Sequence, residues 1–190
     1  MIASVCFQTA VFLDSVACSF REALELHTLS LDLKIKALGH DHVDVATSYG
    51  SIAIIYQRQG KYMEALELHE KSKAIRIKAL GHDHVDVARS YTGIASIYQA
   101  QGKYVEALEL YEKSKAIQIK ALGHDHVDVA ASYNNIATIY TRQGKYVEAL
   151  ELYEKSKAIK IKALGEDDVG VILASTLIAI INKLVEALGQ

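Results

Sequence analysis

Histidine and aspartate residues cluster at three places in this sequence, and imidazoles and carboxylates are side chains that can bind zinc or nickel. Six of the eight histidines flank an aspartate in the sequence HDHVD, as the pairs His40 and His42, His82 and His84, and His124 and His126. A closed zinc site needs about four ligands converging at about 2 Å. Three loops in successive repeats would instead be separated by the width of a helical hairpin, so we expect no metal and no other cofactor.

The alternative for these loops is a structural role, with Gly81 ending one helix and Asp86 capping the next. A fourth copy of the loop, Glu166-Asp167-Asp168, has lost both histidines, which favours this interpretation.

Other reactive residue types do not combine into a catalytic site. The motif QGK, at Gln59, Gln101 and Gln143, is followed by tyrosine and lacks the upstream glycine of a phosphate-binding loop. Ser72, Ser114 and Ser156 stand where small packing residues are expected, and no histidine and acid recur with them as a triad requires. The sequence therefore predicts no catalytic residue and a protein that is not an enzyme.

The composition predicts a folded, all-α protein. The chain is 51% hydrophobic and 23% charged, and it has no proline and no tryptophan. A net charge of -2 gives no general attraction to nucleic acid or to an anionic membrane. The only cysteines, Cys6 and Cys18, exclude a disulfide framework, and a reducing cytoplasm is the expected location.

Two apolar stretches raise the question of a membrane. The N-terminal one resembles a secretory signal, but no Lys or Arg precedes it and Asp14 interrupts it. The stretch from Val169 to Ile181 is shorter than the roughly 20 residues of a membrane span, and Lys183 and Glu186 follow it. We expect a helix docked on the protein and no membrane span.

An internal repeat of 42 residues organises the chain. The sequence LGHDHVDVA begins at Leu38, Leu80 and Leu122, and residues 80–121 match residues 122–163 at 35 of 42 positions. The predicted units are a degenerate first repeat (1–38), three repeats (39–80, 81–122 and 123–164) and a truncated repeat or capping helix (165–190). The truncation removes the counterpart of the Gln143-Gly144 turn, so the last segment is expected to form one helix.

Each repeat is predicted to form two helices. In the second repeat Tyr91, Ile94, Ala95 and Tyr98 recur at spacings of three and four, which places them on one helical face. Gly102 ends this helix, and a second amphipathic segment follows it. Because one hairpin cannot bury both apolar faces, successive hairpins must stack as a solenoid.

The spacing of the packing residues resembles the tetratricopeptide repeat. Tyr91, Ile94, Ala95, Tyr98, Ala107 and Tyr111 stand at that motif's positions, and the pattern recurs in the neighbouring repeats. Over about residues 20 to 165 the chain resembles the 42-residue repeats of kinesin light chains. The resemblance implies an α-α superhelix, a right-handed solenoid of antiparallel helix pairs, that acts as a protein-binding scaffold or cargo adaptor.

The second and third repeats differ at seven positions, and six of them follow one face of the first helix. In the resembled family this face lines a concave groove that holds partner peptides. Drift of an exposed face between duplicates is the alternative. The predicted groove residues are Thr47, Gly50, Ser51, Ile54, Gln57, Arg58, Arg89, Thr92, Gly93, Ser96, Gln99, Ala100, Ala131, Asn134, Asn135, Thr138, Thr141 and Arg142.

These positions include three arginines and no acidic residue, so an extended, acidic peptide is the expected partner. In the resembled family an asparagine at the position of Asn135 contacts cargo peptide. A second hypothesis is a self-associating structural array, because the last helix has apolar residues nearly all round, at Ile172, Leu173, Leu177, Ile180 and Ile181. A metal-binding histidine ridge is the least favoured alternative.

Overall fold

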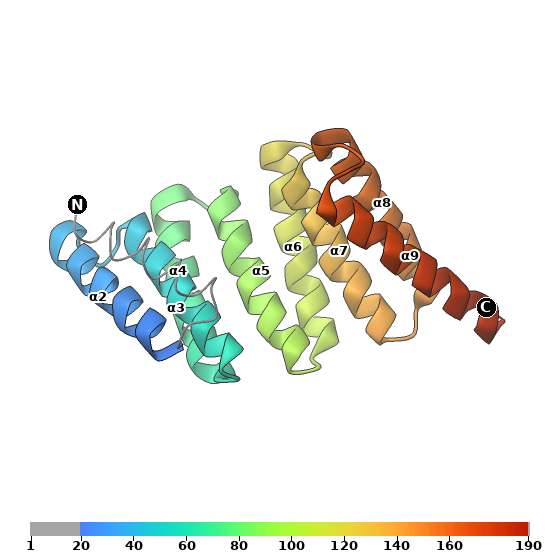
Figure 1. Ribbon diagram of the computed structural model, residues 1–190. Helices are drawn as coiled ribbons and strands as arrows, with labels where there is room; N and C mark the ends of the chain where they lie inside the picture. Colours follow the sequence, from blue (N-terminus) through green and yellow to red (C-terminus); the bar gives the residue numbers. More distant parts are fainter. Residues whose placement is uncertain (1–19, 190) are drawn as a thin grey trace. The chain divides into compact units, whose positions relative to one another are not determined.

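The computed structural model describes residues 20–189, in which every regular element is an α-helix (Figure 1). The predicted all-α class is therefore confirmed. The predictions about Cys6, Cys18, the N-terminal apolar stretch and the first half of the degenerate repeat lie outside the described residues. The helices are α2 (Phe20–Leu38), α3 (Val43–Arg58), α4 (Tyr62–Leu80), α5 (Val85–Ala100), α6 (Tyr104–Leu122), α7 (Val127–Arg142), α8 (Tyr146–Leu164) and α9 (Val169–Leu188).

The chain divides into two compact units, the first ending at Ile97 and the second beginning at Tyr98. In the first unit α3 packs against both α2 and α4. Leu31, Val45 and Ile52 form one buried cluster, and partly buried tyrosines pack around it. A second cluster contains Ala53 and Ala65, whose small side chains let α3 and α4 approach closely.

The second unit repeats this arrangement and adds the last helix. Ala137 of α7 and Ala149 of α8 are fully buried beside Tyr153, and Ile178 and Ile181 of α9 complete the same cluster. The buried serines predicted to be packing residues do lie at helix contacts. In this unit Ser156 donates a hydrogen bond of 2.8 Å to the backbone oxygen of Ala130.

The prediction that Asp86 caps the N-terminus of its helix is wrong. Helix α5 begins at Val85, and Asp86 lies inside its first turn. The backbone N–H of Asp86 donates to Nδ1 of His84 at 3.1 Å, so the histidine performs the capping role. His42 and His126 cap α3 and α7 in the same way. A neutral imidazole nitrogen accepts a hydrogen bond as a carboxylate oxygen does, so histidine can replace the expected aspartate cap.

A glycine and two aspartates of these loops also have structural roles. Gly81 ends α4 with a φ of 84°, in the left-handed region that favours glycine. The loop aspartates Asp41 and Asp125 form ion pairs with Lys78 and Lys162, at the ends of the second helices. Within residues 20–189, no three His, Cys, Asp or Glu side chains gather as metal ligands would.

The last helix, α9, runs without a break from Val169 to Leu188. Asp168 caps it by accepting from the N–H of Gly170 at 2.8 Å, so an aspartate here replaces the capping histidine of the earlier repeats. With 20 residues the helix is longer than the apolar stretch considered from the sequence, and its length and composition would suffice to cross a membrane. Such a helix is weak evidence of a span, and one face of α9 is buried on α8.

Candidate functional site

The predicted groove residues follow one face of each first helix, on α3, α5 and α7. Their spacings of three, four and seven residues align them along each helix, and none of them is buried. Arg58, Arg89 and Arg142 are exposed, whereas Asn134 and Asn135 are half-buried. The first helices therefore present these side chains at the protein surface, while the opposite faces form the cores.

The structure brings the faces of α3 and α5 together in the first unit. The side-chain amide of Gln57 donates to Oγ of Ser96 at 3.1 Å. Both residues belong to the predicted set, although they are 39 positions apart in the sequence. The two helices thus contribute to one continuous surface.

A position on the second helix also reaches this surface, although its spacing predicts only a packing role. In the second unit the hydroxyl of Tyr111 donates to Oε1 of Gln99 at 2.9 Å. The hydroxyls of Tyr153 and Thr138 lie 3.1 Å apart, within hydrogen-bond distance. Burial raises the pKa of Tyr111 to about 12, so its hydroxyl stays protonated at neutral pH.

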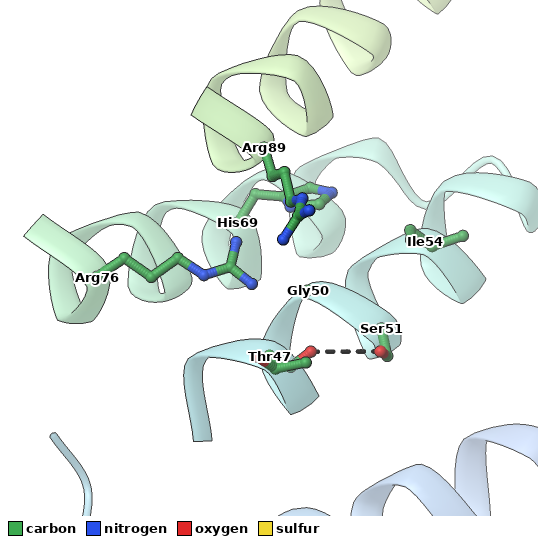
Figure 2. A pocket seen from close by; sticks show the side chains of 7 residues that line it. All are labelled: Thr47, Gly50, Ser51, Ile54, His69, Arg76 and Arg89. Carbon is green, nitrogen blue, oxygen red and sulfur yellow. Dashed lines mark hydrogen bonds between the residues drawn. The ribbon is translucent and has the colours of Figure 1, made fainter. Parts of the chain in front are cut away.

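In the first unit the corresponding residue is His69, and it lines a hollow of about 200 Å³ (Figure 2). Five of the lining residues were predicted from the sequence and two, His69 and Arg76, were not. The complete lining consists of Thr47, Gly50, Ser51, Ile54, His69, Arg76 and Arg89. Helices α3, α4 and α5 all contribute to it.

Arg76 links the second helix of one repeat to the first helix of the next. Its Nη1 donates to Oγ of Ser90 at 2.9 Å and to the backbone oxygen of Asp86 at 3.2 Å. Its side chain is buried, which lowers its pKa; the nearby Asp86 raises this pKa and Arg89 lowers it. A buried guanidinium is expensive to desolvate unless negative charge balances it.

His69 is 5% exposed, and its ring packs against the helix backbone at Gly93. A Cβ atom at Gly93 would lie 2.4 Å from Cε1 of His69, so any larger residue at this position would force the ring to shift. Burial lowers the pKa of His69 to about 4, and the charge of Arg76 adds to this effect while Glu70 opposes it. The imidazole is therefore neutral at physiological pH.

Arg89 has an acidic neighbour that the face pattern did not reveal. Its Nη1 lies 2.5 Å from a carboxylate oxygen of Asp86, one helical turn earlier. Asp86 therefore acts on both arginines of the hollow and offsets part of their charge. The face remains basic but less strongly than its residue types alone indicate.

Sequence signals for the two missed residues did exist. The position of His69 holds histidine at His27 and His69 but tyrosine at Tyr111 and Tyr153. The position of Arg76 is the one difference between the second and third repeats that falls on the second helix, as Gln118 and Lys160. Variation at both positions marks them as candidates for the same surface.

Comparison with known protein families identifies the family to which this chain belongs. The tetratricopeptide repeat model matches residues 17–78, 44–118, 86–162 and 128–185. None of the curated proteins compared with the chain matches it.

Solved structures are similar over nearly the whole chain. A candidate kinesin light chain of Podosopora anserina with nearly identical TPR-like repeats is 31% identical, with a TM-score of 0.75, over 98% of this chain and 87% of that one. A glutamine-to-methionine variant of the same protein is 30% identical, with a TM-score of 0.76, over 98% and 86%. BtubC (BKLC) from P. vanneervenii, 21% identical over 92% and 69%, shares the fold with a TM-score of 0.77.

The matched repeats cover most of the chain, and the helical hairpins carry the small and aromatic residues at the positions that the repeat requires. The predicted tetratricopeptide-type solenoid is thus confirmed, and with it the coarse role of a protein-interaction module. The chain belongs to the tetratricopeptide repeat family, and its repeats are similar to those of kinesin light chain-like proteins.

Proposed function

We propose that the protein is a non-enzymatic scaffold or cargo adaptor of the cytoplasm, which binds an extended acidic peptide along its first helices. The observation that carries this proposal is the composition of the accessible face of each first helix. Those of α3, α5 and α7 hold Arg58, Arg89 and Arg142 respectively, and that of α7 also holds the amides of Asn134 and Asn135. Arginine pairs bidentately with carboxylates, and amides can hold the backbone of an extended peptide.

The similarity to kinesin light chain-like repeats supports a cargo-adaptor role of this kind. The side chains behind the face support it as well, because Tyr111 and Tyr153 hold Gln99 and Thr138 by hydrogen bonds. Groups that are fixed before binding lose less conformational entropy when the partner arrives.

Calorimetry with a Glu-rich peptide tests the proposal. Arg89→Glu and Asn135→Ala should each abolish measurable binding, because the first reverses a charge on the face and the second removes an amide. Lys71→Glu is the matched control, since it makes the same charge change and also breaks an exposed ion pair, here with Glu67 at 2.7 Å. Unchanged affinity in both face variants would refute the proposal.

The structure of α9 favours a second candidate function, a self-associating array. Val171, Ala174, Ile178 and Ile181 are buried, yet the other sides of the helix remain apolar and accessible. The exposed large apolar residues of this helix are Val169, Ile172, Leu173, Leu177, Ile180, Leu184 and Leu188. Exposed apolar surface of this extent is typical of an interface.

Light scattering separates the two candidates. A self-associating array predicts a mass above that of one chain, and the double variant Leu173→Glu, Leu177→Glu should reduce the mass to 20.9 kDa. A monodisperse monomer of the unchanged protein at high concentration would eliminate this second candidate and leave the peptide-binding proposal standing.

A further inference from the structure

The hollow between α3, α4 and α5 contains two guanidinium groups. Figure 2 shows those of Arg76 and Arg89 directed toward one another above Gly50, with His69 beside them. The carboxylate that acts on Arg76 is that of Asp86, which is already engaged with Arg89 at 2.5 Å. The two guanidinium groups therefore share the carboxylate of Asp86, while Glu70, which acts on His69, pairs with Lys73 at 2.5 Å.

The charge of Arg76 is not needed to connect the helices. In the second repeat the neutral Gln118 occupies the same position, and its Oε1 accepts from Oγ of Ser132 at 2.6 Å. In the degenerate first repeat Lys34 donates to Ser48 at 2.9 Å. A side-chain hydrogen bond to the serine is thus common to these repeats, whereas among Lys34, Arg76, Gln118 and Lys160 only Arg76 places a guanidinium at this position.

Two residues that line the hollow each have a buried nitrogen atom without a hydrogen-bond partner in the part of the chain that the structure describes. These atoms are Nε of Arg76 and Nε2 of His69, in side chains that are 8% and 5% exposed. A buried polar atom without a partner costs free energy, and a bound ion is one arrangement that removes this cost. The hydroxyls of Thr47 and Ser51 lie on the opposite wall, where each donates to a helix carbonyl at 3.1 and 3.2 Å.

From this arrangement we infer that the hollow binds a phosphate-type oxyanion, carried by a protein partner as a phosphorylated side chain. A phosphate group has three acceptor oxygens and nearly two negative charges at neutral pH, which match two arginines better than one carboxylate does. Guanidinium groups bind such oxygens bidentately, and the hydroxyls of Thr47 and Ser51 can turn to donate to them. The inference rests on the proposed function in that the partner would lie along the same face.

Binding of a short Ala- and Gln-containing peptide with a single phosphoserine tests the inference, measured by fluorescence anisotropy at constant ionic strength with the full chain. The phosphorylated peptide should bind about tenfold more tightly than the same peptide with serine or glutamate at that position. Arg76→Gln should remove this preference and still fold, because Gln118 shows that glutamine supports the link to serine. Lys71→Gln, an equal loss of charge on the exposed side of α4, should leave the preference intact.

Equal affinity for the phosphorylated and unmodified peptides, or an undiminished preference in Arg76→Gln, would overturn the inference. Inorganic phosphate that binds as tightly as the phosphoserine peptide would also overturn it, since the site would then serve the free ion. The proposed function and this site can fail separately. If Glu-rich peptides bind, and this binding is lost in Arg89→Glu and Asn135→Ala but kept in Arg76→Gln, the proposed function stands. If no phosphoserine preference accompanies that binding, the phosphate site is refuted. Phosphoserine binding that depends on Arg76, without affinity for Glu-rich peptides, would support the phosphate site and refute the proposed binding of acidic peptides.

Discussion

At the scale of single residues, corresponding positions of the repeats carry side chains with different chemical properties. His69, Tyr111 and Tyr153 occupy one position of the second helix, and each is buried with its polar end toward the first-helix face. The residue opposite His69 is Gly93, whereas Asn135 stands at the corresponding place beyond Tyr111. The effect of a substitution at one of these paired positions should therefore depend on the residue at the other.

Gly93→Ala tests the fit of the His69 ring. The new Cβ would lie 2.4 Å from Cε1 of this enclosed ring, so we expect a loss of about 1 to 3 kcal/mol in the free energy of unfolding. Gly50→Ala is the control, because its Cβ would meet only Oγ of Ser72, at 3.9 Å. That change should stabilise the helix by about 1 kcal/mol. Urea denaturation measures both, and equal effects of the two variants would contradict the tight fit.

The pH dependence of stability reports on His69 itself. Its pKa is about 4 in the folded protein, against the ordinary value of 6.5, so the folded state favours the neutral imidazole. The resulting stability is complete above pH 6.5 and is lost as the pH falls toward 4, because the unfolded chain takes up the proton first. The shift corresponds to roughly 3 kcal/mol.

His69→Tyr introduces the residue of the later repeats and removes this titration. Between pH 6.5 and pH 4 the variant should therefore lose less stability than the unchanged protein, by roughly 3 kcal/mol. Urea denaturation across this range makes the comparison. Parallel pH profiles would show that His69 does not titrate in the way its burial predicts.

At the scale of helices, periodicity and glycine placement predict most of the structure. The turns at Gly60 and Gly144 adopt positive φ angles of 74° and 75°, as expected for glycines that separate two helices. Spacing also predicts which side chains of α3, α5 and α7 share a face. Spacing within one helix carries no information about what a neighbouring helix adds, so the contributions of Arg76 and His69 were missed.

The capping histidines make a second prediction at this scale. His126→Ala should destabilise the protein by about 1 kcal/mol, because the N–H of Asp128 loses its acceptor at 3.1 Å. His126→Asp should be neutral or stabilising, since Asp168 caps α9 in the same position. Thermal unfolding of the two variants checks this, and an alanine variant as stable as the aspartate one would contradict a capping role.

At the scale of the whole molecule, the repetition explains why the fold could be predicted from the sequence and why some residues of the candidate site could not. Near-identical repeats identify the fold, because residues that pack the hairpins recur while those on the exposed face vary. They conceal the contribution of Arg76 to the hollow, because Arg76 lies in the first repeat, which is not part of the most nearly identical pair. Each unit presents its own part of the variable face.

The most direct test of peptide binding along the first helices is a map of amide chemical-shift changes, recorded by NMR as a Glu-rich peptide is added to the isotopically labelled protein. We predict saturable changes on the accessible face of the first helices in both units, at residues such as Ser51, Gly93 and Asn135. The exposed Glu and Lys residues of α4, α6 and α8 should remain unperturbed. Saturable changes confined to those second-helix surfaces or to α9 would contradict binding along this face.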